Sequence, residues 1–232
     1  MEQILLCREE DKCYPAILRG ITGMPSFLYY RGDIEILNQN KNIAIVGSRH
    51  SSDMGLRLAY ETGRLAAEKG FNVVNGLALG CDAEAIKGAI SVGGKCAVVL
   101  PCGLENVQPK SNRYLAEQIL ENGGCLLSEY PEGTVLRKYN YVARDRIQSG
   151  MSHGVVIVEA EVDSGTMHTA DFARRQYKRL ACYASKILQY SSGNQELENK
   201  KNAKVLNDLH EAENFFDLIK EEPTCEQLCL KF

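Results

Sequence analysis

The chain has 232 residues, of which 44% are hydrophobic and 25% are charged, and its formal net charge is −3. These values are typical of a globular protein with one large α/β domain, and they exclude a generally basic coat for nucleic acid. No apolar run approaches the roughly 20 residues that span a bilayer, and the acidic residues close to Met1 do not fit a signal peptide. A polyanion site would therefore require a local concentration of positive charge.

Residues 1–40 are expected to form a preface that packs on the core of the protein. Its prolines, Pro15 and Pro25, and the turn signal Gly32-Asp33 predict a packed loop with one small strand rather than a separate domain.

Residues 41–185 alternate between short apolar runs and amphipathic segments. The predicted strands lie at 43–47, 71–75, 96–100, 125–128, 154–159 and 180–184. The predicted helices lie near 53–69, 82–92, 111–122, 141–151 and 166–178. Such alternation builds βαβ units, so we predict an α/β fold, an extended Rossmann-like and mostly parallel sheet with helices on both faces. Residues 186–232 are predicted to form a polar connection and an amphipathic helix near 203–220.

The carboxyl ends of the predicted strands lead into small, hydroxyl-bearing and cationic residues. The first strand ends in Gly47-Ser48-Arg49 before a helix opens at Asp53, and the fifth is followed by Ser164-Gly165-Thr166. Ligands of open α/β sheets bind at these ends, where the amides of helix N-termini favour anions. Each junction alone fits a helix cap, but five along one edge of the sheet predict a phosphate-binding site.

Two common nucleotide-binding motifs are missing. There is no GxGxxG fingerprint and no acidic residue at the end of the second strand, which argues against hydride transfer with NAD. The segment Gly88–Cys96 imitates a Walker A loop, but it precedes a strand and ends in cysteine. We interpret it as a helix end that turns into the next strand.

The nine cysteines are odd in number and scattered, and their close pairs lack the Cys-x-x-Cys spacing of a zinc site. We therefore expect reduced thiols in a cytoplasmic protein, with no metal and no cofactor. The close pairs are Cys7 with Cys13, Cys96 with Cys102, and Cys225 with Cys229.

Positive charge gathers in two segments. Arg144 and Arg146 follow Tyr139 and Tyr141, and aromatic rings interleaved with cations suit a single nucleic-acid strand, because the rings stack on bases and the cations attract the backbone. A second cluster on the next predicted helix is interpreted as a solvated helix face. It consists of Arg174, Arg175, Lys178 and Arg179.

The order of these motifs closely resembles the DNA-processing protein A family (DprA, also called Smf). The resemblance covers about residues 14–185. The motifs that carry it are Gly47–Arg49, Asn75–Asp82, Ser128–Gly133, Arg144–Ser152 and Val158–Ala170.

This resemblance implies a homodimer that binds single-stranded DNA in a basic pocket and loads the RecA recombinase during transformation or recombination, with no catalytic reaction and no membrane partner. The chain departs from the family at Asp145, which stands where the family usually has asparagine and would weaken binding if it faced a phosphate. By position, the resemblance assigns the strand-binding site to Gly47, Ser48, Arg49, Gly76, Arg144, Arg146, Ser164, Gly165 and Thr169.

Two other functions use the same broad fold. Nucleotide phosphoribohydrolases carry a Pro-Gly-Gly-x-Gly-Thr-x-x-Glu loop, but Thr169 stands at its glutamate position and cannot supply the carboxylate that glycosidic cleavage needs. Hydrolysis would then require His168 as acid or base, or another carboxylate that points into the site. The candidate carboxylates are Glu129, Glu159 and Asp163. A non-catalytic nucleotide or signal sensor is the third interpretation.

Overall fold

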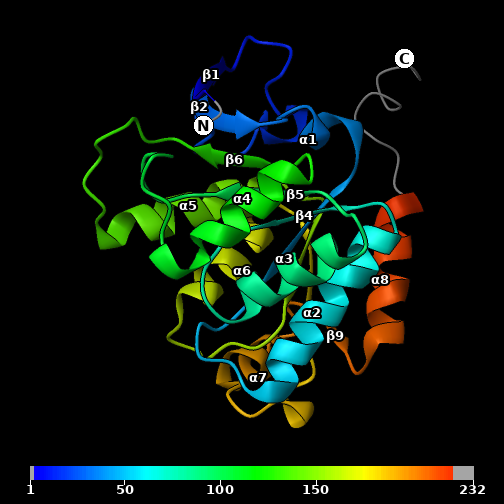
Figure 1. Ribbon diagram of the computed structural model, residues 1–232. Helices are drawn as coiled ribbons and strands as arrows, with labels where there is room; N and C mark the ends of the chain where they lie inside the picture. Colours follow the sequence, from blue (N-terminus) through cyan, green and yellow to red (C-terminus); the bar gives the residue numbers. More distant parts are fainter. Residues whose placement is uncertain (1–2, 222–232) are drawn as a thin grey trace.

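The structure is a computed structural model that describes residues 3–221, shown in Figure 1. A nine-stranded sheet passes through these residues in the order β1-β2-β6-β5-β4-β3-β7-β8-β9. β2 pairs antiparallel with β1 and β6, and all other neighbouring strands are parallel. The strands are β1 Leu5–Arg8, β2 Phe27–Gly32, β3 Asn42–Val46, β4 Asn72–Asn75, β5 Cys96–Val99, β6 Cys125–Ser128, β7 Gly154–Ile157, β8 Arg179–Tyr183 and β9 Lys204–Leu206.

Helices cover both faces of this sheet, which confirms the predicted α/β class. No helix of the described residues has the length and apolar character needed to cross a membrane. The α-helices are α1 Ile36–Gln39, α2 Asp53–Glu68, α3 Cys81–Ser91, α4 Arg113–Glu121, α5 Lys138–Gly150, α6 Gly165–Arg175, α7 Ser192–Asn199 and α8 Leu209–Glu221. The 3-10 helices are η1 Ala16–Leu18, η2 Lys110–Asn112 and η3 Ser185–Ile187.

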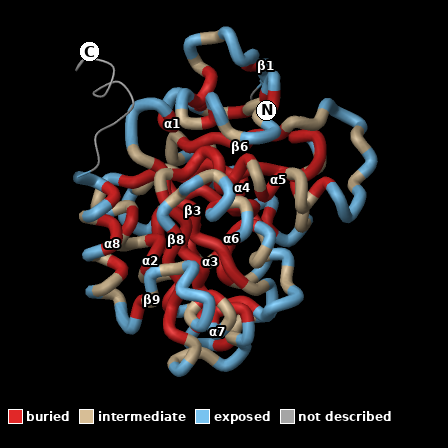
Figure 2. The backbone as a smooth tube through the Cα atoms, turned by 180° about the vertical axis from the view of Figure 1, so that it is seen from behind, coloured by how far each residue is buried: buried red, intermediate tan, exposed pale blue. Residues whose placement is uncertain are grey.

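The central strand β3 shows how the sheet separates two cores. All of its residues are buried. Ile43 and Ile45 pack in the core with α2, α3 and α8, whereas Ala44 and Val46 pack on the opposite face with α6 and α7. A parallel strand covered on both faces needs an unbroken apolar run, which is what the sequence supplies. Figure 2 shows the resulting buried centre surrounded by exposed loops and outer helix faces.

The elements between residues 41 and 185 lie within a few residues of their predicted positions, but the two ends of the chain differ. Residues 1–40 contribute two strands, β1 and β2, where we predicted one, and residues 186–221 add α7 and β9 before the last helix. All three segments that we distinguished in the sequence supply strands to one sheet. The missed strands β1 and β9 are the two edge strands of the sheet, and most of their residues are not buried, so they lack the buried apolar run of the central strands. They form here because an existing strand edge pairs with them. Cys225 and Cys229 lie outside the described residues.

Asn194 on α7 ties the carboxyl ends of two strands together from a fully buried position. Its Oδ1 accepts a hydrogen bond from Ala160 N–H at 2.8 Å. Its Nδ2 donates to the carbonyls of Val158 at 3.0 Å and Tyr183 at 2.9 Å. This amide therefore fixes the loop that leaves β7, which leads directly into the candidate site.

Candidate functional site

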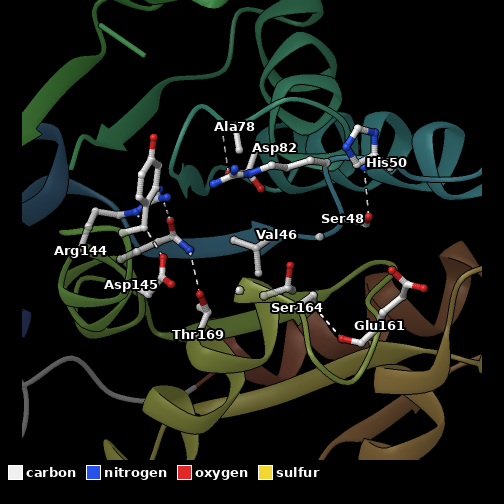
Figure 3. A pocket seen from close by; sticks show the side chains of 16 residues that line it. Val46, Ser48, His50, Ala78, Asp82, Arg144, Asp145, Glu161, Ser164 and Thr169 are labelled. Carbon is white, nitrogen blue, oxygen red and sulfur yellow. Dashed lines mark hydrogen bonds and ion pairs between the residues drawn. The ribbon is translucent and has the colours of Figure 1, made fainter. Parts of the chain in front are cut away.

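The strand order reverses at β3. The chain proceeds from β3 through β4, β5 and β6 in one direction, and returns to place β7, β8 and β9 on the other side. The loops after β3 and β7 therefore leave the sheet toward opposite faces, and a crevice opens between them. A pocket of about 350 Å³ occupies this crevice (Figure 3). It is lined by Val46, Gly47, Ser48, Arg49, His50, Ala78, Asp82, Tyr141, Arg144, Asp145, Gln148, Glu161, Ser164, Gly165, Thr166 and Thr169.

The loop after β3 forms one wall of the pocket. Gly47 has no space for a side chain, because a Cβ there would approach Cys81 Cβ to 2.7 Å and the carbonyl of Glu159 to 3.1 Å. Ser48 N–H donates to that same carbonyl at 2.7 Å. The exposed Arg49 reaches across the opening, where its guanidinium lies 5.1 Å from the centre of the Tyr141 ring. The wall thus presents an accessible cation beside an aromatic ring.

Glu159 holds this loop in place from a fully buried position. Its carboxylate accepts hydrogen bonds from Ser51, from Ser52 N–H at 2.7 Å, and from the N–H groups of Gln189 at 3.0 Å and Tyr190 at 2.9 Å. Burial alone would raise the pKa of Glu159, but these bonds outweigh burial and leave its pKa below the ordinary value. The Glu159 carboxylate is therefore ionised and holds three loops together through its hydrogen bonds, and it does not line the pocket.

The amino end of α6 forms the opposite wall. The Ser164 hydroxyl does not cap this helix, since it donates to the carbonyl of Glu161 at 2.6 Å. The N–H groups in the first turn of a helix have no partner within the helix, so those at Gly165 and Thr166 can serve an anion. Thr169 lies one turn further on, is buried, and accepts a hydrogen bond from Gln148 Nε2 at 3.4 Å.

Arg144 enters the pocket from α5 but is largely enclosed, with 5% of its surface exposed. Its Nη1 donates to Gln148 Oε1 at 3.0 Å and to the carbonyl of Val99 at 3.3 Å. Its guanidinium lies against Gly76, where any Cβ would collide with it. The absence of a side chain at Gly76 is thus what admits this cation to the site.

Two buried carboxyl groups accompany Arg144. Asp145 Oδ1 lies 3.2 Å from Arg144 Nε. Burial raises the pKa of Asp145 from 3.8 to about 7, against the lowering effect of Arg144 and Arg49, and the nearby Asp82 raises it further. Burial also raises the pKa of Asp82, although Arg144 and the N–H groups of Gly76 and Ala78 oppose it. The charge of Arg144 is therefore partly balanced within the protein, and Arg49 is the more available cation.

Arg146 lines neither this pocket nor the hollow beside it, although the sequence assigned it to the site. It forms a two-pronged ion pair with Glu129, and its Nε donates to the carbonyl of Gly23 at 2.7 Å. Two residues correspond to about 200° around a helix, so Arg144 and Arg146 project from opposite sides of α5. The structure thus brings Gly47, Ser48, Arg49, Arg144, Ser164, Gly165 and Thr169 together in the pocket and places Arg146 elsewhere.

A second hollow of about 100 Å³ adjoins the first. Both are lined by Arg49, Ala78, Tyr141 and Arg144, so the two hollows share a wall, and we refer to the two together as the groove. Gly76, the remaining predicted site residue, lies in this second part. The other lining residues there are Leu79, Gln108 and Pro109.

The catalytic residues considered for hydrolysis are not among the residues that line the pocket. Glu129 is paired with Arg146, and Glu159 is committed to backbone N–H groups. Asp163 and His168 are exposed and do not line the pocket. The acidic residues that do line it are Asp82, Asp145 and Glu161.

Sequence reasoning did not assign Asp82, Gln148 or Tyr141 to the site. A usable signal existed for Tyr141, which lies three residues before Arg144 and therefore on the same side of α5. Asp82 looked like an ordinary acidic residue in the first turn of a helix. Only the packing of α3 beside β3 reveals that its carboxyl group faces the groove.

The fold and groove define a class: a Rossmann-like α/β protein with a crevice, lined by an exposed arginine and the amino end of a helix, where its strand order reverses. The family described as DNA recombination-mediator protein A matches residues 5–217, and the chain belongs to that family.

The chain is 38% identical over 167 residues to protein Smf of Synechocystis, an alignment that covers 71% of this chain and 42% of that relative. It therefore spans less than half the length of this relative. Among solved structures, DNA processing protein A of Streptococcus pneumoniae is 29% identical with a TM-score of 0.83, over 96% of this chain and 75% of that one. The Helicobacter pylori protein, whose structure is described as revealing a single-stranded DNA binding mode, is 28% identical with a TM-score of 0.83, over 96% of this chain and 100% of that one.

Proposed function

We propose that this chain binds single-stranded DNA in the groove where the strand order reverses. The observation that carries the proposal is an exposed arginine beside an aromatic ring, Arg49 and Tyr141, in a groove opposite the open amino end of α6. The solved Helicobacter pylori relative, described as binding single-stranded DNA, supports the same choice of ligand.

The chemistry of the groove suits a nucleotide strand. Arg49 and the N–H groups of Gly165 and Thr166 supply positive charge and hydrogen-bond donors for phosphates. The Tyr141 ring offers a stacking surface that any base can use once the guanidinium moves aside. A pocket of about 350 Å³ lies in the size range of small-ligand sites, so it suits one nucleotide unit, with neighbouring units in the adjoining hollow.

A titration of fluorescent oligo-dT by anisotropy at low salt tests this proposal, with a duplex of equal length for comparison. Arg49→Glu should weaken oligo-dT binding about tenfold or more and reduce its salt dependence. Arg57→Glu is the matched control, because Arg57 is exposed on α2 and lies outside the groove. Equal losses in both variants, or equal affinity for duplex and single strand, would contradict the proposal.

We further propose, from the family resemblance, that the chain acts as a homodimer and delivers the bound strand to RecA. Light scattering at monomer mass would contradict the dimer. A RecA partnership predicts faster onset of RecA ATP hydrolysis on single-stranded DNA when the protein is added, and no change when the Arg49→Glu variant replaces it.

Nucleotide hydrolysis is a weaker candidate, because Thr169 is buried and bonded to Gln148 where a phosphoribohydrolase has its catalytic glutamate. Incubation with nucleoside monophosphates should return intact substrate by chromatography. Release of free base would favour the enzyme instead.

A further inference from the structure

Two cysteines of the preface face each other outside the groove. Cys7 on β1 and Cys13 in the following loop have their Sγ atoms 2.7 Å apart. This separation is within about 1 Å of a disulfide bond length. Cys7 is fully buried, whereas Cys13 is half-buried. From the sequence we expected two reduced thiols here, because the pair lacks the Cys-x-x-Cys spacing of a zinc site.

The chain between the two cysteines is folded into a tight turn that fixes their approach. Asp11 Oδ2 accepts a hydrogen bond from Arg8 N–H at 2.7 Å, and Asp11 N–H donates to the carbonyl of Arg8 at 3.0 Å. Tyr14 N–H then donates to the carbonyl of Asp11 at 3.1 Å. β1 is itself held in register by β2, with Cys7 opposite Leu28.

Asn38 holds the far side of the loop. Its Nδ2 donates to the carbonyl of Tyr14 at 3.3 Å, and its Oδ1 accepts from Ala16 N–H at 2.8 Å. Hydrogen bonds on both sides of the turn thus bring the two thiols together.

We propose that Cys7 and Cys13 form an oxidant-sensitive dithiol that closes to a disulfide when hydrogen peroxide reaches it. The half-buried Cys13 reacts first: its sulfur attacks one peroxide oxygen, the O–O bond breaks, and water leaves, which gives a sulfenic acid. The Cys7 sulfur then attacks the Cys13 sulfur and a second water leaves. Two thiols lose two electrons in total, and one hydrogen peroxide is reduced to two waters.

Burial agrees with this order of events. It raises the pKa of the Cys7 thiol, and the adjacent Cys13 raises it further. A protonated, enclosed thiol is a poor first target for an oxidant, so the first attack falls to Cys13. In the second step the Cys7 thiol gives up its proton to the departing hydroxyl of the sulfenic acid, which leaves as water.

A metal site is the competing use of the same residues, because Cys7, Asp11 and Cys13 offer three donor atoms within 4.8 Å of one another. Two thiolates on one tetrahedral zinc ion would lie about 3.7 Å apart, given zinc–sulfur bonds of about 2.3 Å. The observed 2.7 Å is well short of that separation, and one Asp11 oxygen is already engaged by Arg8 N–H. The geometry therefore favours the disulfide.

The bond would brace the helix that carries Arg144. Cys7 packs in one buried cluster with Tyr14 and Leu18 of the preface, and with Ile147 and Met151 at the end of α5. Closing a loop of only seven residues, Cys7 to Cys13, restricts the unfolded preface. Oxidation should therefore stabilise this cluster and raise the melting temperature by about 5 °C.

The sequence provides a direct assay. Trypsin cleaves after Arg8 and Lys12, so Cys7 and Cys13 fall in different peptides. The full chain is treated with one equivalent of hydrogen peroxide, its remaining thiols are blocked with N-ethylmaleimide, and the digest is read by mass spectrometry. We expect the two peptides to be joined and 2 Da lighter than their sum, the melting temperature to rise, and dithiothreitol to reverse both changes.

Cys13→Ser should remove the peroxide-dependent rise in melting temperature, whereas the control Cys96→Ala should keep it, since Cys96 is buried in the other core. The mass measurement on the unmodified chain requires no variant to fold. Separate peptides after peroxide would overturn the proposal. The proposal would also be overturned if the reduced chain bound one equivalent of Zn²⁺ and peroxide treatment gave no linked peptide.

Discussion

Asp145 makes the proposed DNA binding depend on pH. Its carboxyl lines the groove, 7% exposed, with a pKa raised by burial to about 7. The charged groups around it are Arg144, Asp82 and Arg49, which act on its pKa in opposite directions. A DNA phosphate seated in the same groove adds negative charge and favours the protonated carboxyl. Binding should therefore take up a proton wherever Asp145 is ionised in the free protein.

The size of the effect follows from that pKa. With a pKa of about 7 in the free protein and a carboxyl group that stays protonated in the complex, raising the pH from 6 to 8 should weaken binding by up to about tenfold. This factor corresponds to about 1.4 kcal/mol. The sign is fixed by linkage: the complex holds more protons than the free protein, so affinity falls as the pH rises through 7. Asp145→Asn removes the titrating group and should bind equally at both ends of this range.

The assay is oligo-dT anisotropy at pH 6, 7 and 8 and constant ionic strength. Asp145→Asn at pH 8 should match the unmodified protein at pH 6. His50→Gln is needed as a control, because His50 is another ionisable side chain that lines the groove. If Asp145→Asn retains the tenfold change while His50→Gln abolishes it, or if the unmodified protein shows no change, the reasoning fails.

Three further substitutions separate binding from stability. Gly76→Ala should displace Arg144 and weaken oligo-dT binding at least about tenfold with an unchanged circular dichroism spectrum; unchanged affinity would contradict the steric argument. Arg146→Ala should lower the melting temperature by about 5 °C, through loss of about 2 kcal/mol from its pair with Glu129, yet leave binding within about twofold. Asn194→Ala should cost about 3 kcal/mol in urea unfolding, because it leaves three buried backbone groups unpaired; a loss below 1 kcal/mol would refute this assignment.

The fold between residues 41 and 185 was predictable because its information is local. Each parallel strand must be apolar on both faces, as in Ile43–Val46, and each covering helix must repeat its apolar residues every three to four positions. The short edge strands β1 and β9 were missed for the converse reason, since their backbone hydrogen bonds to a neighbouring strand stabilise them more than their own side chains do.

Half of the groove was also predictable. Gly47–Arg49 and Ser164–Thr169 follow strands that the topology brings side by side, and carboxyl ends of parallel strands lie at one edge of the sheet. The contribution of α5 was not predictable. Its sequence has few apolar residues, so nothing local shows which side packs on the sheet, and the neighbouring arginines Arg144 and Arg146 looked equivalent.

The sequence by itself determined the order of strands and helices along residues 41–185, and with it the position of Gly47–Arg49 and Ser164–Thr169 after the carboxyl ends of strands. Only the tertiary structure decided which charges are available there. Arg146 forms an ion pair with Glu129, which lies 17 positions away in the sequence. Arg144 is buried near Asp82, 62 positions away, whereas Arg49 is exposed beside the Tyr141 ring. The physical reason is that helices and strands follow from the pattern of residues close together in the sequence. Electrostatic pairing instead depends on distances of a few ångströms between segments that are far apart in the sequence and meet only in the folded protein.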